Sequence, residues 1–425
     1  MNVLASACLL LLLLATAAWP GDAPAPSANA GRLGTYQADL KRFAQYKFWV
    51  CVPAAYGDEA PSGLHLFFHG QNGQTGAPNF GQWQGAFLEP FNLIGINMQY
   101  LDGDNTKDSD GKVEAAQAAI AQVMADYKVV LRGAVNSFSG GGIPHSGLHA
   151  KVAASLPTQA WPFTHASLYG SNYRGGIGDG LGMSWFIGLG GGEWSMATPT
   201  LGTTQTARMG ELLGLALKHG SPDAYLRIEK EKGHSISNAD VASAAAMFRR
   251  SDLALGRFLH EASWTGKAKP LAAQANSLAL GQAEDAIAKA LKSETLPAED
   301  RERITKLKSL LDARVDAVFT LMQELSANDA VLANWYGAVF SAQLKGHSRA
   351  KELKELLGGM AKDAAARKQS QAWEVFAKAY PSVIDGGGPT IKQPDKSVPL
   401  LEQIRTIAGE RSLAGTMARE FLLLR

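Results

Sequence analysis

The chain has 425 residues, of which 46% are hydrophobic, and its formal net charge at pH 7 is +2. This length predicts two or three domains, and the hydrophobic content is enough to give them full cores. The small net charge argues against a strongly basic surface of the kind that binds nucleic acid or an anionic membrane.

Residues 1–18 have the pattern of an export signal. The apolar run Leu9–Leu14 is followed by Ala15-Thr16-Ala17, which has the small-x-small form of a signal-peptidase site. No Lys or Arg precedes the run, so a membrane anchor is the alternative, but the run falls short of the roughly 20 residues that a span needs. We expect a secreted or periplasmic protein that keeps no membrane span and, with Cys51 alone remaining, no internal disulfide.

An α/β domain is expected over residues 39–265, after a disordered lead-in at 19–38 that is rich in Pro, Ala and Ser. The expected strands are Tyr46–Pro53, Leu64–Phe68, Leu93–Tyr100, Val129–Phe138, His165–Tyr169, Trp185–Leu189 and Ala224–Lys230. The expected helices are Val113–Tyr127, Thr206–His219 and Asn238–His260. Strands that alternate with helices predict a mostly parallel sheet covered on both faces.

Residues 271–425 carry no strand signals and predict an all-helical C-terminal domain. Its longest helix begins at Pro297 and has an apolar stripe with steps of three and four residues: Ile304, Leu307, Leu311, Val315, Val318, Met322 and Leu325. The stripe needs partner helices, for which the candidates are Ala330–Leu344, Arg349–Met360, Ala364–Tyr380, Val398–Ile407 and Ala414–Leu424. A small bundle or a short array of helix pairs would satisfy this pattern.

The apolar strand ending at Phe138 stops on a serine set among small residues. Ser139 has Ser137 two residues before it and Gly141 two residues after it, in the pattern S-x-S-x-G. A serine at a sharp turn from strand to helix requires small residues at those two positions, because larger ones would collide with the turn. The segment therefore predicts a nucleophile elbow, and a Gly/Ser-rich loop after a buried strand is the alternative.

Two more motifs follow other strands. His69–Gly73 (HGQNG) comes after Leu64–Phe68, and Gly233-His234-Ser235 comes after the last strand. With the elbow, these motifs make residues of about 40–260 resemble the α/β-hydrolase superfamily, particularly its serine esterases and lipases. The resemblance implies an α/β-hydrolase fold and an enzyme that cleaves carboxylic esters through an acyl-enzyme.

The resemblance also assigns roles to residues. It makes Ser139 the nucleophile and His234 the base, since imidazole titrates near neutral pH. It gives the oxyanion hole to the backbone N–H groups of Gly140 and Gln71. An ordinary loop histidine is the alternative for His234.

The triad acid departs from the family pattern. Many similar esterases read G-E-x-D after the strand that Trp185–Leu189 would form, and this alignment puts Ser195 at the position of the acid. Glu193 is the preferred acid, because it lies directly after that strand. Asp179 and Asp223 are held in reserve, and a Ser–His dyad without an acid is the remaining option.

Two further clusters are candidate metal sites, and both are disfavoured. Asp102–Asp110 has alternating oxygen ligands, but it lacks the central Gly and distal Glu of a calcium loop. His145 and His149 lie four residues apart, without the adjacent Glu and third ligand of a zinc site. We expect neither a metal nor a cofactor.

The leading functional hypothesis is an exported serine hydrolase that acts on a small-molecule or polymeric ester. A serine peptidase or an acyltransferase on the same scaffold is one alternative. Another is a hydrolase-fold binding protein with a weakened catalytic site, whose helical domain recognises a protein partner. Because the chemical motifs all precede Trp264, we expect a chain that ends there to fold and to keep some activity.

Overall fold

The computed structural model describes residues 24–40, 43, 46–57, 61–70, 80–100, 109–155, 163–174, 183–190, 193, 197–198, 203–204, 213–214, 223–229, 231–383 and 391–423. The expected signal at 1–18 lies outside these residues, as do Gln71, Asp179, Ser195, most of the Asp-rich loop and most of the expected helix Thr206–His219. Within the described part of the chain, no helix is long and apolar enough to cross a membrane.

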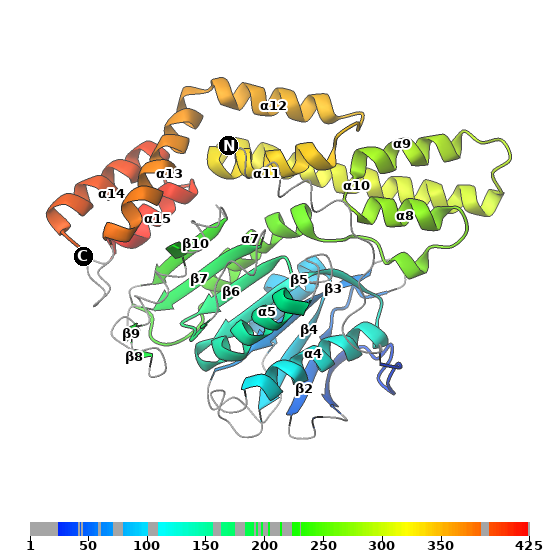
Figure 1. Ribbon diagram of the computed structural model, residues 1–425, viewed down its shortest axis with the longest axis horizontal. Helices are drawn as coiled ribbons and strands as arrows, with labels where there is room; N and C mark the ends of the chain where they lie inside the picture. The colour runs from blue at the N-terminus through cyan, green and yellow to red at the C-terminus, as the bar shows by residue number, and fades with distance from the viewer. Residues whose placement is uncertain are drawn as a thin grey trace.

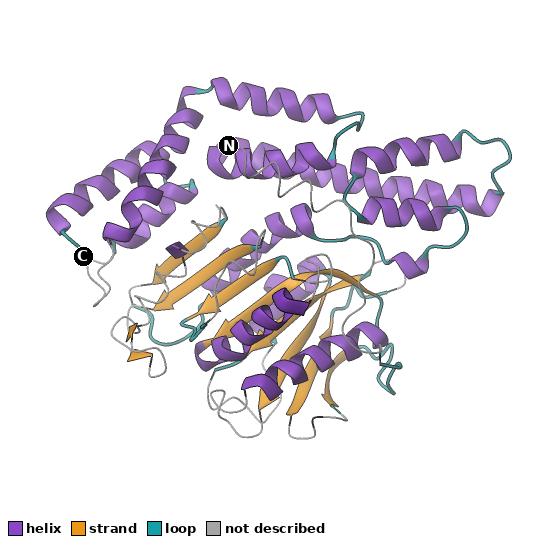
Figure 2. Ribbon diagram, in the orientation of Figure 1, coloured by secondary structure: helices purple, strands orange, loops and turns teal. Residues whose placement is uncertain are grey.

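An eight-stranded sheet forms the centre of the α/β part (Figures 1 and 2). Its strands in spatial order are β1 (Gly34–Asp39), β2 (Tyr46–Val52), β4 (Leu93–Tyr100), β3 (Ser62–Phe68), β5 (Val129–Phe138), β6 (His165–Tyr169), β7 (Ser184–Gly190) and β10 (Ala224–Glu229). Only β2 runs antiparallel to its two neighbours, and the other described pairs in this sheet are parallel. The short strands β8 (Ala197–Thr198) and β9 (Thr203–Thr204) pair with each other.

The first strand corrects one expectation. A disordered lead-in is expected over 19–38, but Gly34–Asp39 pairs with β2 along its full length. Tyr36 is buried and its hydroxyl lies 2.5 Å from that of Tyr127. The segment is short and follows a run rich in Pro and Ala, so its alternation of buried and exposed residues gives a weak signal.

Helices cover both faces of the sheet, which confirms the predicted fold class. On one face lie α4 (Ser109–Asp126) and α5 (Gly142–Ser155), in front of the strands in Figure 1. On the other lie α2 (Gly81–Trp83), η1 (Gln84–Leu88), α3 (Glu89–Phe91) and α7 (Asn238–Leu255). Strand residues alternate between the two layers: Leu66 packs in the hydrophobic cluster with α4, and Phe67 packs in the cluster with α7.

The C-terminal segment is helical, as predicted. After the short helix η6 (Glu261–Ser263), its helices are α8 (Ala268–Asn276), α9 (Leu280–Leu291), α10 (Ala298–Asn328), α11 (Ala330–Gln343), α12 (Ala350–Lys362), α13 (Ala364–Val383), α14 (Pro394–Ala408) and α15 (Leu413–Leu422). Pro297 directly precedes α10, and the predicted apolar stripe of this helix is buried along its whole length. Asp329 caps the start of α11 by accepting the N–H groups of Val331 and Leu332.

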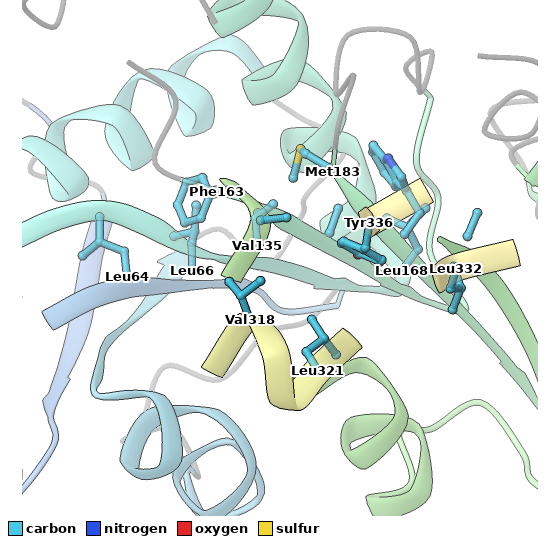
Figure 3. Close-up of a cluster of buried hydrophobic side chains, with 14 of the residues drawn as sticks. Leu64, Leu66, Val135, Phe163, Leu168, Met183, Val318, Leu321, Leu332 and Tyr336 are labelled. Carbon is cyan, nitrogen blue, oxygen red and sulfur yellow. The ribbon is translucent and has the colours of Figure 1, made fainter. Parts of the chain in front are cut away.

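These helices share one hydrophobic cluster with the sheet (Figure 3). Val318 and Leu321 of α10 and Leu332 and Tyr336 of α11 belong to the same cluster as the sheet residues Leu64, Leu66, Val135 and Leu168 and as Phe163 and Met183, which precede β6 and β7. Polar contacts add to this core: Arg314 donates to the carbonyls of Asp252, Leu253 and Gly256 at the end of α7. The change to purely helical structure near residue 265 therefore does not coincide with a gap in the core.

The last helix covers one edge of the sheet. β10 pairs with β7 on one side only, which leaves N–H groups on its other side. The N–H of Ile228 donates to Glu420 Oε2 at 2.7 Å, and the N–H of Leu226 donates to Met417 Sδ at 3.3 Å. Because bare edge strands can pair with other chains, α15 protects β10 from such pairing.

Candidate active site

Ser139 occupies a strained turn at the carboxyl end of β5. Its φ is +51°, in the left-handed region, which costs a residue other than glycine about 1–2 kcal/mol. Phe138 before it is extended, and the short helix Ser139–Gly141 leads into α5 after it. This is the backbone geometry of a nucleophile elbow, which presents the serine hydroxyl above the sheet.

Gly141 shows why the elbow needs small residues. A Cβ atom on Gly141 would collide with the carbonyl oxygens of Phe68 and His69 at the end of β3. The backbone of the elbow therefore lies directly against the neighbouring strand. The glycine of the S-x-S-x-G pattern is required sterically, and the sequence interpretation of that position holds.

The oxyanion-hole region is described in part. Gly140 follows Ser139 at the start of a helical segment, where backbone N–H groups have no partner within the helix. Gly70 lies beside the nucleophile, since a Cβ on it would be 3.2 Å from Ser139 Cβ. Gln71, the second predicted donor, is the next residue along the chain and lies outside the described residues. The first residues after β3 thus lie beside Ser139.

Glu193 and His234 lie in contact at the same end of the sheet. Glu193 follows β7 and is buried, and its Oε1 is hydrogen-bonded to His234 Nδ1. Its Oε2 accepts the N–H of Gly190. A carboxylate only accepts hydrogen bonds, so His234 Nδ1 is the donor in this contact, and in the neutral ring Nε2 is then the acceptor.

Two residues that sequence reasoning did not assign to the site support this pair. Gly170 follows β6 with φ +48°, and a Cβ there would collide with Glu193 Oε1 and come within 3.1 Å of His234 Nδ1. The Phe138 ring is stacked on the His234 ring, with centroids 4.5 Å apart. A glycine directly after a predicted strand was the available signal for Gly170.

The loop that carries His234 is anchored by buried charge. Asp240, at the start of α7, is fully buried and pairs with Lys232 and with Arg227, whose Nη1 is 2.6 Å from Asp240 Oδ1. Asp240 also forms a capping box with Ser237. These contacts fix the chain on both sides of His234.

Phe138 connects Ser139 and His234. Phe138 is adjacent to Ser139 in the chain and stacks on His234 in space. Among the described residues, no hydrogen bond joins the Ser139 hydroxyl to the imidazole in this structure. Such catalytic contacts are often long in free enzymes and tighten when substrate binds.

Asp223, one of the reserve acids, lies at the wrong end of the sheet. It directly precedes β10, so it is at the amino end of a strand whose carboxyl end leads to His234. Its carboxylate pairs with Arg250 at 2.6 Å and accepts the Tyr336 hydroxyl at 2.5 Å. Asp223 is therefore a structural carboxylate, and its place as a reserve acid is wrong.

His145 and His149 are both buried inside the protein. Their rings contact each other at 4.6 Å between centroids. His145 Nδ1 lies 2.8 Å from Ser137 Oγ, and His149 Nδ1 lies 2.8 Å from the Tyr173 hydroxyl. Burial lowers the pKa of His149 to about 3 and that of His145 well below its ordinary value, so both rings are neutral at pH 7. This arrangement fits the packing role that the sequence favours over zinc binding.

Comparisons with known proteins find similarity only at the level of structure. No protein-family profile and no curated protein matches the sequence. A poly(3-hydroxybutyrate) depolymerase from Bordetella parapertussis is 18% identical, with a TM-score of 0.34, over 52% of this chain and 89% of that one. A siderophore hydrolase from Aspergillus nidulans is 11% identical, with a TM-score of 0.38, over 56% of this chain and 99% of that one.

One similar structure extends further along the chain. An uncharacterised protein from Capnocytophaga ochracea covers 77% of this chain and 99% of its own, at 12% identity and a TM-score of 0.31. Likenesses at these values carry no information on substrate. The strand order, the single antiparallel strand β2 and the strained serine after β5 give residues 34–255 the α/β-hydrolase fold.

Proposed function

We propose that this chain is a serine hydrolase that cleaves carboxylic esters through an acyl-enzyme on Ser139. His234 acts as the base, and Glu193 orients it and stabilises its charged form. The backbone N–H of Gly140, together with that of Gln71, binds the oxyanion. The chemistry needs no metal and no cofactor.

The reaction follows from the hydrogen-bonding roles of these groups. Ser139 Oγ attacks the ester carbonyl carbon while His234 Nε2 takes its proton, and the developing oxyanion accepts the N–H of Gly140. The intermediate collapses, the C–O bond to the alcohol breaks, and His234 returns the proton to the leaving oxygen. Water, deprotonated by His234, then attacks the acyl carbonyl carbon. The bond to Ser139 Oγ breaks, His234 returns the proton to that oxygen, and the acid leaves.

One observation carries this proposal: a serine with φ +51° ends β5 at the same sheet edge where His234 is hydrogen-bonded to Glu193. The backbone strain is maintained in spite of its cost, which is typical of functional sites. The binding-protein alternative depends on a missing acid, and a buried carboxylate on His234 disfavours it. Peptidase and acyltransferase activities share this machinery and differ only in leaving group or acceptor.

A fluorophosphonate probe tests the proposal directly. Wild-type protein should be labelled on one serine, and mass spectrometry of the digest should identify that serine as Ser139. Ser139→Ala should abolish both labelling and hydrolysis of p-nitrophenyl esters, since no other residue carries the acyl group. Wild-type protein that is neither labelled nor active, although folded, would refute the proposal. An amide substrate and an added alcohol acceptor in the same assay distinguish hydrolysis from peptidase and transferase activity.

We further propose that the protein is exported through the signal at residues 1–18. The support is the apolar run followed by a small-x-small site. Fusion of residues 1–25 to a reporter that is active only outside the cytoplasm tests this. An N-terminal sequence of the mature protein that starts near residue 18 would show cleavage, and an intact N-terminus would instead favour an anchor.

A further inference from the structure

Ser137 stands two residues before the nucleophile, where the elbow pattern usually has glycine. Its side chain is fully buried. It lies on the same face of β5 as Val135, which packs in the cluster with α4 and α5. Its Oγ is 2.8 Å from His145 Nδ1 in α5 and 3.0 Å from Ser171 Oγ after β6. A glycine at this position would make neither contact.

The contacts of Ser137 reach the backbone of the nucleophile. Asn172, the residue after Ser171, donates its N–H to the carbonyl oxygen of Ser139 at 2.7 Å. Ser171 also packs against Gly142, where a Cβ would collide with its Oγ. The hydroxyl of Ser137 thus links β5, α5 and the loop after β6 around the one residue of the elbow whose φ is strained.

The ring of His145 acts in this network by hydrogen bonding and not by charge. It is fully buried, and burial holds its pKa well below the ordinary value. A neutral imidazole nitrogen and a hydroxyl can exchange donor and acceptor roles. The contact between His145 and Ser137 is therefore a neutral hydrogen bond whose strength does not depend on pH near 7.

We propose that Ser137 is a positioning residue: with His145 and Ser171 it holds the Ser139 backbone so that the adjacent Gly140 N–H points at the oxyanion. A strained conformation persists only where its surroundings over-determine it, and these hydrogen bonds supply that constraint. The inference rests on the proposed function. The serine that replaces the usual glycine of the elbow is thus a working part of the site.

Ser137→Ala tests this by removing the hydroxyl alone. We expect kcat to fall by about tenfold with little change in KM, because a small displacement of an oxyanion donor affects the transition state more than the bound substrate. A boronic acid inhibitor, which forms a tetrahedral adduct on serine, should bind more weakly by a similar factor. Ser137→Gly should show the same loss, although it restores the residue that elbows usually have.

Ser184 offers a matched control. Ser184 begins β7, at the opposite end of the strands from the elbow, and is buried like Ser137. Its Oγ is 2.7 Å from Nδ1 of a buried histidine, His165, which begins β6. Ser184→Ala should lower the urea midpoint of unfolding about as much as Ser137→Ala does, while kcat stays at the wild-type value. If folded Ser137→Ala keeps the wild-type kcat and inhibitor affinity, the hydroxyl of Ser137 has only a structural role and the inference is wrong.

His145 supplies a second, independent test. Asn at this position can place an amide near the Nδ1 position and keep the contact with Ser137, whereas Leu cannot. His145→Asn should retain more of the wild-type kcat than His145→Leu, and equal rates would contradict the inference. If Ser137→Ala does not fold, Ser171→Ala breaks the same network from the loop and should reproduce the loss in kcat. Fluorophosphonate labelling of the wild type separates this inference from the proposed function, because failure of the wild type to label refutes the function itself.

Discussion

At the amino ends of the strands, Asp223 is held by Arg250 and Tyr336, and Arg314 donates to three carbonyls. At the carboxyl ends, Ser139 is held in a strained conformation, and its hydroxyl makes no hydrogen bond to another described residue. At the first edge the buried charges are satisfied by contacts between α7 and the C-terminal helices α10 and α11. The second leaves the reactive hydroxyl without a hydrogen bond to the part of the chain that the structure describes. Changes to Asp223 at the first edge should therefore affect mainly stability, and changes to Ser139, His234 and Glu193 at the second should affect mainly the reaction.

The largest effect should come from removing the C-terminal helices. A chain that ends at Trp264 loses α10, α11 and α15, which share the hydrophobic cluster with the sheet, and with α15 it loses the cover on the edge of β10. Because the core is shared, we expect that this fragment does not fold by itself. It should be insoluble, or it should show no cooperative unfolding transition in circular dichroism. A fragment that is soluble, unfolds cooperatively and is active would show that the α/β domain does not need these helices to fold.

Glu193→Gln should affect the carboxyl edge alone. The amide cannot stabilise the imidazolium and favours the wrong tautomer of His234, so kcat should fall by about 10⁴-fold. Its shape is that of Glu, so the free energy of unfolding should change little by comparison. Steady-state ester hydrolysis measures the rate, and urea unfolding gives the stability. A loss in kcat of less than about tenfold would move the role to Asp179 or indicate a Ser–His dyad.

Asp223→Asn should give the reverse pattern. Removing the charge leaves Arg250 buried without its partner, which costs about 3–5 kcal/mol of stability. Because Asp223 lies before β10 and not after it, kcat measured below the unfolding transition should match the wild type. Circular dichroism in urea and ester hydrolysis at low temperature check the two halves of this prediction. A large loss of kcat in folded protein would restore Asp223 as a catalytic candidate.

Acid should weaken the fold through its buried histidines. His65, His149 and His165 are fully buried, and burial lowers the pKa of each to about 3. In the unfolded chain they titrate near pH 6.5, so the stability from their neutral form is complete above about pH 6.5 and is lost as the pH falls toward 3. Each ring should reduce the unfolding free energy by about 1.4 kcal/mol per pH unit in that window.

Urea unfolding at pH 5 to 7 measures this slope, since most carboxylates remain ionised there. His149→Gln should reduce the slope by about one proton, and Ser139→Ala should leave it unchanged. A free energy of unfolding that does not vary between pH 5 and 7 would mean that these rings bind protons in the folded protein as they do in the unfolded chain, which would contradict the lowered pKa values.

Much of the α/β part could be predicted from the sequence. Apolar runs bounded by Gly, Pro and Asp indicated seven of the eight strands of the sheet, and the small residues around Ser139 indicated the elbow. These features depend on neighbours in the chain, because strand alternation and turn sterics are local. The loops after β3, β7 and β10 could also be identified as parts of the candidate site, since the motifs of α/β-hydrolases occur in a fixed order along the chain.

What could not be predicted depends on long-range contacts. The sequence shows Asp223 as a carboxylate near a strand. Only the structure shows that its carboxylate is paired with Arg250 and hydrogen-bonded to Tyr336. The apolar stripe on α10 must be covered, but the sequence does not reveal whether another helix or the sheet covers it. The contact between Ser137 and His145 was likewise hidden, because β-strand and helix periodicity do not say which faces meet.

The cover on β10 has a consequence for the order of folding during synthesis. Ile228 and Glu420 are separated by 192 residues. At about 5–20 residues per second, a ribosome needs roughly 10–40 s to make that length of chain. Throughout this interval the outer N–H groups of β10 are without their final partner, so the nascent sheet has an edge that another nascent chain could join. The edge of β10 is therefore protected only once α15, the last helix, has been made. Slowing translation of the final segment should increase aggregation without altering the finished fold.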